Sequence, residues 1–284
     1  MRDAKLFQDS AYLQKNQYRD SRNLDARAVL HRRFSTAVSD WQPWVFDLLQ
    51  LKPGMRVLEC GCGPGWLWRE NVDRIPANCH ITLTDLSPGM VAEAEAALTG
   101  SGHRFAFQQA NIQALDFANE TFDVVVANHM LYHVPDLPQG LAEVRRVLKN
   151  DGRFIAATNG NKHMKELPTL VPEALRAVSG STLVRGESEM LPFRLENGRA
   201  ALEPYFHTID LHLYDDSLWI TEVEPLLAYA FSMIKPEMDV PETAVAHLRE
   251  VWAAKIAAEG GIHISKDSGV FVAVGSGSGV EIGG

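Results

Sequence analysis

Val57-Leu58-Glu59-Cys60-Gly61-Cys62-Gly63-Pro64-Gly65 is the stretch that decides how this 284-residue chain folds. The apolar run 55–59 follows a Lys-Pro-Gly turn and predicts a buried parallel strand. The three glycines allow a tight turn and the close approach of a ligand, because no Cβ intervenes. A second predicted strand, 81–84, ends at Asp85, about 20 residues past the last glycine, where nucleotide-binding sheets place the carboxylate that binds ribose hydroxyls. We therefore expect an adenosine-type ligand at the carboxyl edge of a parallel sheet.

The spacing of the glycines distinguishes between adenosine ligands. Dinucleotide-binding turns have the pattern Gly-x-Gly-x-x-Gly, whereas this chain has Gly-x-Gly-x-Gly with Pro64 inside it. Glu59, at the end of the first strand, would repel a pyrophosphate but suits a ligand that carries an ammonium and a sulfonium. None of the six tyrosines is followed four residues later by lysine, the catalytic pair of short-chain dehydrogenases. These features disfavour a nicotinamide dehydrogenase.

Four ordered blocks make the chain resemble the class I S-adenosylmethionine-dependent methyltransferases. They are the turn above, Leu83-Thr84-Asp85-Leu86-Ser87-Pro88-Gly89-Met90, Phe122-Asp123-Val124-Val125-Val126-Ala127-Asn128 and Arg146-Val147-Leu148-Lys149-Asn150-Asp151-Gly152-Arg153-Phe154. The resemblance is close over 50–160 and looser elsewhere. It implies an α/β fold, a Rossmann-like doubly wound sheet of seven mostly parallel strands, with the last strand antiparallel between strands five and six. It also implies S-adenosyl-L-methionine as the cofactor.

The charge balance bears on the partners of the protein. The formal net charge is −9, whereas a nucleic-acid surface needs a basic stripe, so we expect neither nucleic acid nor an anionic membrane as partner. The N-terminus is charged and no apolar run is long enough to span a bilayer, which favours a cytoplasmic protein without a signal peptide. Cys60, Cys62 and Cys79 have neither disulfide-framework nor zinc-site spacing. A homodimer is left open.

Expected helices and strands alternate along the first part of the chain. They are a helix at 41–50, a strand at 55–59, a helix at 65–75, a strand at 81–84, a helix at 88–97, strands at 105–110 and 124–128, a helix at 137–148 and a strand at 153–158. Beyond 160 we expect a strand at 205–214, helices at 221–235 and 241–258, and a last strand at 269–274. We divide the chain into an N-terminal helical lid (1–40), a cofactor-binding core (41–160), cap insertions with the last strands of the same sheet (161–274) and a flexible tail (275–284).

Positions shared with the family imply a set of cofactor contacts. The set is Glu59, Gly61, Gly63, Gly65, Asp85, Leu86, Met90, Asn111, Ile112 and Asn128. In it, Asp85 would bind the ribose, Glu59 the methionyl ammonium and Met90 the adenine face. Asn111 stands where relatives usually carry an acid, so its hydrogen bond to the adenine amino group would lack charge. The alternatives are that Asp85 only begins a turn, that Glu59 only orients a helix and that Met90 only packs in the core.

Two further groups of residues invite catalytic hypotheses. In 129–133 we expect His133 or Tyr132 to act as a general base, because neutral imidazole titrates near working pH. A metal bound by His129 and His133 is disfavoured because no third ligand is evident, so we expect no metal. In 17–27 we expect a lid, with Tyr18 near the sulfonium and Arg27 paired with the cofactor carboxylate. The alternative for 129–133 is that the histidines only cap and pack the loop after the fourth strand. The alternative for 17–27 is a solvated helix packed on the sheet.

The sequence therefore predicts an enzyme of secondary metabolism that transfers a methyl group by SN2 displacement to a small-molecule acceptor. The Asn/Asp-Pro-Pro-Tyr/Phe block of base and glutamine methyltransferases does not follow the fourth strand. One alternative is a cyclase or lyase that converts the cofactor into azetidine-2-carboxylate and methylthioadenosine. A non-catalytic module that binds the cofactor is the other.

Overall fold

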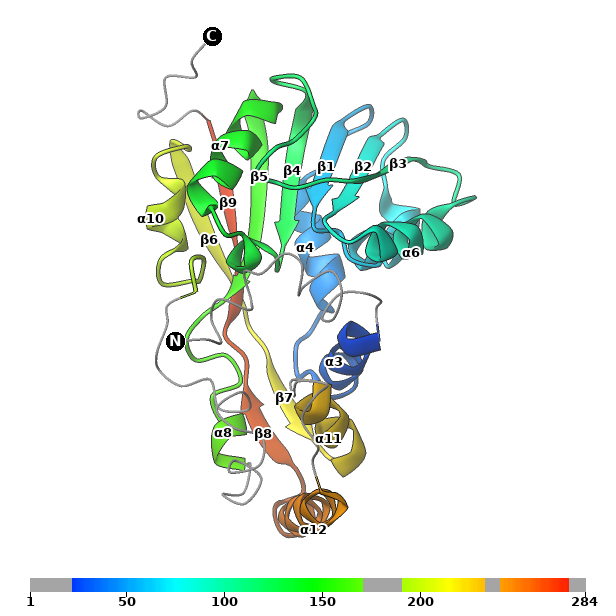
Figure 1. The fold of residues 1–284 in the computed structure, drawn as a ribbon, viewed down its shortest axis with the longest axis vertical. Helices are drawn as coiled ribbons and strands as arrows, with labels where there is room; N and C mark the ends of the chain where they lie inside the picture. Colours follow the sequence, from blue (N-terminus) through cyan, green and yellow to red (C-terminus); the bar gives the residue numbers. More distant parts are fainter. Residues whose placement is uncertain (1–21, 171–190, 233–240, 276–284) are drawn as a thin grey trace.

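The computed structural model describes residues 22–170, 191–232 and 241–275, and Figure 1 shows two bodies stacked along the long axis. The larger body is built on a seven-stranded sheet in the order β3-β2-β1-β4-β5-β9-β6. Its strands are β1 (Arg56–Cys60), β2 (His80–Asp85), β3 (Arg104–Gln109), β4 (Phe122–Asn128), β5 (Leu148–Asn159), β6 (Thr208–Tyr214) and β9 (Ser268–Val274). β1 to β5 are parallel, and β9 lies antiparallel between β5 and β6. The expected doubly wound topology is confirmed.

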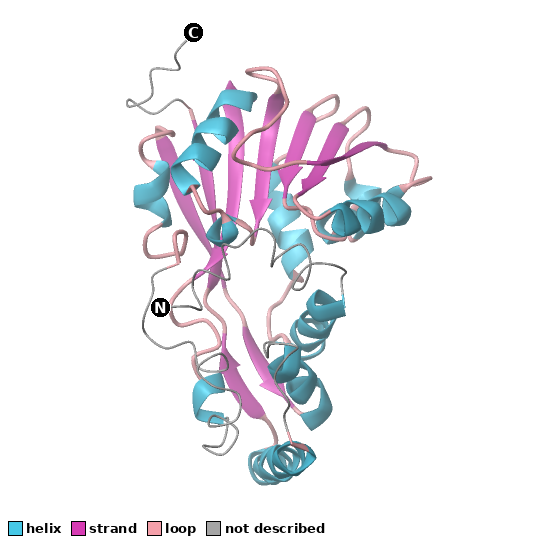
Figure 2. Cartoon of the chain, viewed as in Figure 1, coloured by secondary structure: helices cyan, strands magenta, loops and turns pink. Residues whose placement is uncertain are grey.

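Helices cover both faces of this sheet, as Figure 2 shows. On one face lie α4 (Trp41–Leu49), α5 (Trp66–Arg69), the 3-10 turn η2 (Val72–Arg74) and α6 (Pro88–Leu98); on the other lie α7 (Leu137–Val147) and α10 (Gly198–Leu202). The central strands are continuous apolar runs because neither of their faces meets water. The helix expected over 65–75 is wrong as a single element, since it breaks into α5 and η2 around the buried Asn71, whose Nδ2 donates to the Leu67 carbonyl at 2.8 Å.

The second body contains a two-stranded antiparallel ribbon that the sequence analysis did not predict. The ribbon pairs β7 (Ser217–Ile220) with β8 (Ile262–Ser265). Around it lie α3 (Arg22–Phe34), α8 (Leu167–Leu170), α11 (Val223–Ser232) and α12 (Glu242–Glu259). Leu30 and Phe34 of α3 share one apolar cluster with residues of β7, α11 and α12. The N-terminal helix is therefore packed with a later insertion, and the domain boundaries predicted from the sequence stay a prediction.

A buried ion pair joins the two bodies where the chain crosses between them. Asp216 accepts hydrogen bonds from Ser35 Oγ at 2.8 Å and from the backbone N–H groups of Thr36 and Ala37, both at 3.1 Å. Lys266 also donates to this carboxylate, and the two side chains are 8% and 0% exposed. Four donors thus fix one carboxylate, which holds the second body on the sheet.

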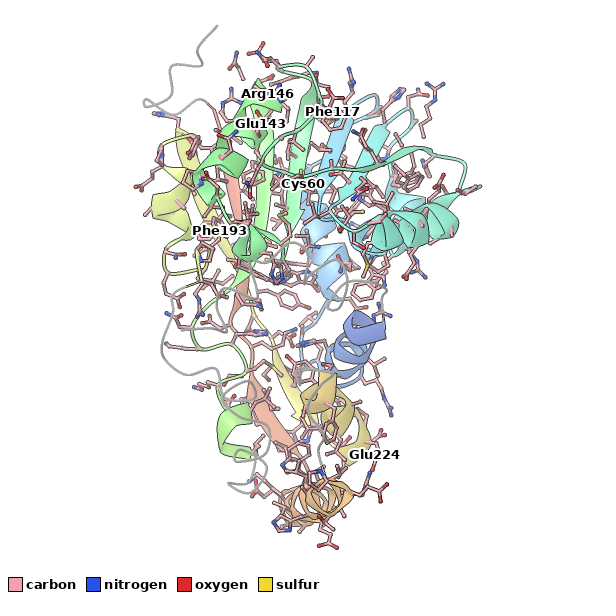
Figure 3. All side chains as sticks on the ribbon, in the orientation of Figure 1. Cys60, Phe117, Glu143, Arg146, Phe193 and Glu224 are labelled. Carbon is pink, nitrogen blue, oxygen red and sulfur yellow. The ribbon has the colours of Figure 1, made fainter. Side chains whose placement is uncertain are left out.

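Arg146, in the last of the four family blocks, holds a loop rather than a ligand. Its guanidinium donates to the Phe117 carbonyl at 2.6 Å, to the Leu115 carbonyl at 2.7 Å and to Glu143 Oε1 at 2.7 Å. Figure 3 shows Arg146 and Glu143 on α7 next to Phe117. Arg146 therefore fastens the connection between β3 and β4 to α7.

Candidate functional site

The three glycines of the turn after β1 all have left-handed backbones but serve three different purposes. Their φ angles are +69° at Gly61, +53° at Gly63 and +76° at Gly65. A Cβ on Gly61 would lie 2.8 Å from the Met130 side chain, and one on Gly65 would lie 3.2 Å from Leu98. A Cβ on Gly63 would meet nothing within 4 Å. Of the three glycines in this turn, Gly63 alone has open space beside it among the described residues, so a ligand could approach there.

Asp85 ends β2 beside this open glycine. Its Oδ2 accepts the N–H of Gly63 at 3.0 Å and its Oδ1 accepts the N–H of Ser87 at 2.8 Å. Burial raises the pKa of Asp85, while these backbone donors oppose the rise. A carboxylate offers about four lone-pair sites, so these donors leave room for a hydroxyl donor. Leu86 follows it, and the Leu86 carbonyl accepts a hydrogen bond from Gln109 Nε2 at 3.0 Å.

Glu59 is a buried carboxyl group at the end of β1. The residue is 2% exposed and its Oε2 accepts the indole N–H of Trp68 at 2.7 Å. Burial raises its pKa to about 8, with the hydrogen bond from Trp68 lowering it and Asp85 raising it further. No lysine or arginine in the described part of the chain forms an ion pair with Glu59. Such a group would bind a cationic ligand without competition.

The residues expected around the adenine are divided between core and surface. Met90 lies in α6 and is 1% exposed, while Ile112 belongs to the main core cluster. Asn111 is exposed, and its Oδ1 accepts the N–H of Gln113 at 3.0 Å. These placements satisfy local structure, and an adenine contact by any of the three stays a prediction.

Asn128 ends β4 next to the glycine turn, but its amide is held by α4. Its Oδ1 accepts the indole N–H of Trp41 at 3.3 Å, and its Nδ2 donates to Gln42 Oε1 at 3.2 Å. Trp41 and Gln42 are therefore site residues that the sequence analysis missed. A polar amide and an indole at the start of a helix are common surface features, so no local signal marked them.

The two candidate bases lie just after β4. Tyr132 and His133 belong to the 3-10 turn η3 (Leu131–His133), with ring centroids 4.6 Å apart. His129 precedes this turn with a left-handed φ of +59°, so the two histidines do not share one face of an α-helix. The described residues contain no group of three potential metal ligands. A catalytic role for Tyr132 or His133 stays a prediction.

The lid residues cannot be placed against the site. Tyr18 lies outside the described residues, and Arg27 lies in α3 with a side chain that the structure does not describe. The proposed contact of Arg27 with the cofactor carboxylate stays a prediction.

An aromatic cluster that the sequence did not predict lies beside Asn128. The ring centroid of Trp41 is 4.8 Å from that of His129, 5.3 Å from that of Trp44 and 5.1 Å from that of Tyr214. The four rings come from α4 and from the ends of β4 and β6. Only the tertiary fold brings them together.

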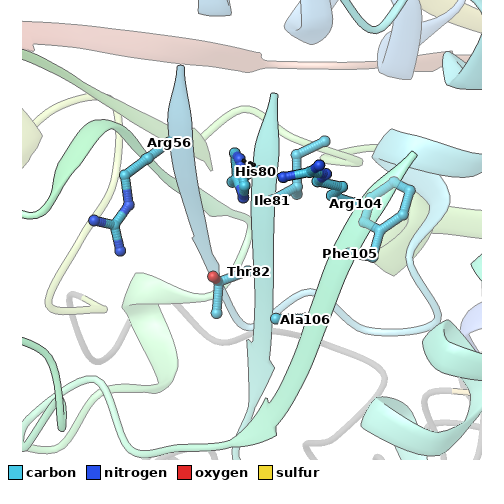
Figure 4. A pocket seen from close by; sticks show the side chains of 7 residues that line it. All are labelled: Arg56, His80, Ile81, Thr82, Arg104, Phe105 and Ala106. Atoms are coloured by element: carbon cyan, nitrogen blue, oxygen red, sulfur yellow. Dashed lines mark hydrogen bonds between the residues drawn. The ribbon is translucent and has the colours of Figure 1, made fainter. Parts of the chain in front are cut away.

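Other features of the described residues take no part in the site at the carboxyl edge of the sheet. A hollow of about 420 Å³ is lined by the first residues of β1, β2 and β3, Arg56, His80 and Arg104, at the amino ends of the strands (Figure 4). It faces away from the glycine turn.

Burial raises the pKa of the Cys60 thiol to about 12, so that thiol stays protonated. No helix of the described residues has the length and apolar character that crossing a membrane requires.

Comparison with known proteins finds relatives for part of the chain. Residues 58–156 match a family described as a methyltransferase domain. The malonyl-[acyl-carrier protein] O-methyltransferase of Erwinia billingiae is 33% identical over 41% of this chain and 43% of its own length. The ubiquinone/menaquinone biosynthesis C-methyltransferase UbiE of Stenotrophomonas maltophilia is 33% identical over 40% of this chain and 46% of its own. The chain thus spans less than half the length of these curated relatives.

A solved structure resembles most of the chain. It is Haemonchus contortus phosphoethanolamine N-methyltransferase 2 in complex with S-adenosyl-L-methionine, with a TM-score of 0.57 and 18% identity. The match covers 95% of this chain and 60% of the other. At this identity, the likeness concerns the fold.

Proposed function

This chain belongs to the class I S-adenosylmethionine-dependent methyltransferase family, and from that premise we propose that it methylates a small-molecule acceptor. The observation that carries the proposal is the convergence of a carboxylate, an open glycine and a buried acid on one edge of the sheet. Asp85, Gly63 and Glu59 meet there, at the ends of β2 and β1. The neighbouring strands β1 and β4 are also where the strand order reverses, which is where open α/β sheets bind ligands.

These residues fit S-adenosylmethionine. The free lone pairs of Asp85 suit ribose hydroxyls, and the space beside Gly63 admits a ligand without a steric clash. Within the described part of the chain Glu59 has no paired cation, so a bound ammonium or sulfonium would stabilise its ionised form. Bound there, the cofactor supplies an electrophilic methyl group on a positively charged sulfur.

The residues of the chain contribute orientation and shielding from water. Asp85 and the turn fix one end of the bound molecule, and the Asp216–Lys266 pair holds the second body below the same edge. Alignment of reacting groups can lower a barrier by about 7–11 kcal/mol. Tyr132 and His133 remain our candidates for removing a proton from an acceptor that requires it.

Several considerations support a small acceptor. The relatives are named for a malonyl group on a carrier protein and for quinone precursors, and the solved neighbour for phosphoethanolamine. The net charge of −9 disfavours nucleic acid as the substrate.

Mass spectrometry of the full chain incubated with S-adenosylmethionine, alone and then with acceptors, tests this function. The acceptors would include a malonyl thioester, quinols and ethanolamine phosphates. We expect adenosylhomocysteine only when an acceptor is present, and no cofactor binding by Asp85→Ala. Asp73→Ala, at an exposed aspartate of η2, is the control. Methylthioadenosine formed without an acceptor, faster than the cofactor breaks down without protein, would instead establish the cyclase or lyase. Binding without turnover would favour a non-catalytic module.

A further inference from the structure

His129 has two unfavourable local features at the carboxyl end of β4. Its backbone φ of +59° is in the left-handed region, which non-glycine residues rarely adopt. Its Nδ1 is buried and has no hydrogen-bond partner among the described residues. Unsatisfied buried nitrogens and strained backbones both destabilise a fold, and both concentrate at functional sites. The pair of features on one residue calls for a functional explanation.

The position of His129 ties it to the cofactor turn. Its N–H donates to the Ala157 carbonyl at 3.2 Å, which anchors the backbone to β5. The next residue, Met130, fills the space beside Gly61, where a Cβ would lie 2.8 Å from the Met130 side chain. His129 is thus one residue away from direct contact with the turn that we propose binds the cofactor.

The rings around His129 supply an apolar surface and no hydrogen bond to its Nδ1. Trp41 lies 4.8 Å away between ring centroids, tilted by 36°, and both Trp41 and Trp44 are half-buried. The Trp41 indole N–H already donates to Asn128, and the Tyr214 hydroxyl donates to a backbone carbonyl. The indole N–H of Trp41 and the hydroxyl of Tyr214 are therefore engaged elsewhere.

Burial, and then one nearby positive charge, keep the imidazole of His129 neutral. Lys266 lies 5.2 Å from the Tyr214 ring centroid and pairs with Asp216. Burial, and then the charge of Lys266, lower the pKa of His129 to about 4. Burial and Asp216 raise the pKa of Tyr214 to about 12. At neutral pH both rings are uncharged, and the imidazole retains a lone pair.

We propose that Nδ1 of His129 accepts a hydrogen bond from the nucleophilic O–H or N–H group of the acceptor, while Trp41 and Trp44 pack against the planar ring of the acceptor. The inference rests on the proposed methyl transfer and names its acceptor class, a hydroxylated or aminated aromatic compound. For a hydroxyl acceptor, an oxygen–methyl bond forms as the sulfur–methyl bond breaks, and the sulfur keeps the electron pair of that bond. In this proposal His129, in place of Tyr132 or His133, takes the proton released by the hydroxyl and returns it to water after the products leave. The charge gained by His129 replaces the sulfonium charge that is lost, so the net charge of the site is unchanged.

Binding of two matched probes tests the hydrogen bond without turnover. Equilibrium dialysis with saturating S-adenosylhomocysteine would compare 1-naphthol with naphthalene, which lacks the hydroxyl. We expect wild type to bind 1-naphthol about tenfold more tightly, the size of one hydrogen bond, and His129→Ala to lose or reverse this preference. His129→Asn tolerates the left-handed backbone and keeps an acceptor oxygen, so it should retain the preference. His80→Ala, at the opposite edge of the sheet, should match wild type.

Nitrogen NMR of protein labelled with ¹⁵N-histidine supplies a second readout. The Nδ1 resonance of His129, assigned from its loss in His129→Asn, should move on addition of 1-naphthol and not of naphthalene. A preference for 1-naphthol that survives in His129→Ala would overturn the hydrogen bond. Failure of both probes to bind a protein that binds adenosylhomocysteine would overturn the acceptor class. Failure of adenosylhomocysteine itself to bind would overturn the proposed function, and this inference with it.

Discussion

Replacement of Glu59 by glutamine should change how the stability of the protein depends on pH. Burial raises the pKa of Glu59 from its ordinary 4.5 to about 8. A carboxyl group whose pKa is higher in the folded state binds more protons when folded than when unfolded. Its contribution to stability is therefore complete below pH 4.5 and is lost as the pH rises towards 8.

The size of this effect follows from the two pKa values. Each pH unit between them corresponds to about 1.4 kcal/mol, so the whole difference is worth roughly 5 kcal/mol. Between pH 5 and pH 8 the unfolding free energy of wild type should lose roughly 3–4 kcal/mol from this group. Glutamine is neutral throughout and its side-chain oxygen can still accept the Trp68 N–H, which lies 2.7 Å from Glu59 Oε2. The Glu59→Gln protein should lack this loss.

Urea denaturation at half-unit steps from pH 5 to pH 8.5 measures the difference. Relative to wild type, Glu59→Gln should gain roughly 3–4 kcal/mol of stability between pH 5 and pH 8. Glu250→Gln, at an exposed position of α12, should follow wild type. A difference between Glu59→Gln and wild type that stays constant with pH would refute the reasoning, because Glu59 would then ionise as it does in the unfolded chain.

The same carboxyl group should couple cofactor binding to proton release. An ammonium or sulfonium near Glu59 favours its ionised form, so binding at pH 7 should expel a proton. Calorimetric titration with S-adenosylmethionine in buffers of different ionisation enthalpy would detect that proton. Glu59→Gln should release none from this position. Equal proton release by both proteins would assign the proton to another group.

Further predictions concern the ion pair that joins the two bodies and the glycine turn. Asp216→Asn should lower the free energy of unfolding by about 3–5 kcal/mol in urea denaturation, because it leaves the buried Lys266 without its counter-charge. A loss below about 1 kcal/mol would contradict this argument. Gly61→Ala should destabilise by more than the roughly 1–3 kcal/mol of a left-handed alanine, because its Cβ collides with Met130, and Met130→Ala should restore part of the loss in a thermal melt. Gly63→Ala should show only that backbone cost but weaken adenosylhomocysteine binding in calorimetry; unchanged affinity would mean that no ligand approaches Gly63.

Much of the sheet could be predicted because its signals are local. Each parallel strand is buried on both faces and therefore appears as a short apolar run between turn residues. The left-handed conformations at Gly61, Gly63 and Gly65 require glycine, so the turn is visible in the sequence as spacing alone. Asp85 is visible for the same reason, because it directly follows such a run. The contacts of these residues with the cofactor stay a prediction.

The purposes of the individual glycines were decided only by the tertiary structure. From the sequence, Gly61 and Gly63 were equivalent ligand contacts. In the fold, Met130, some seventy residues later, occupies the space beside Gly61 and leaves only the space beside Gly63 open. No pattern within the turn contains that information, because the neighbour comes from the segment that follows a different strand, β4.

By itself, then, the sequence determined the doubly wound sheet, the glycine turn and the acid beside it, since each depends on residues close together in the chain. Tertiary structure decided the pairing of β7 with β8 across two intervening helices and the packing of α3 against them. It also decided the assembly of Trp41, His129 and Tyr214 from three separate elements. Contacts of this kind form because the completed sheet brings the ends of distant strands to one edge, and the segments that meet there carry no local pattern of their own.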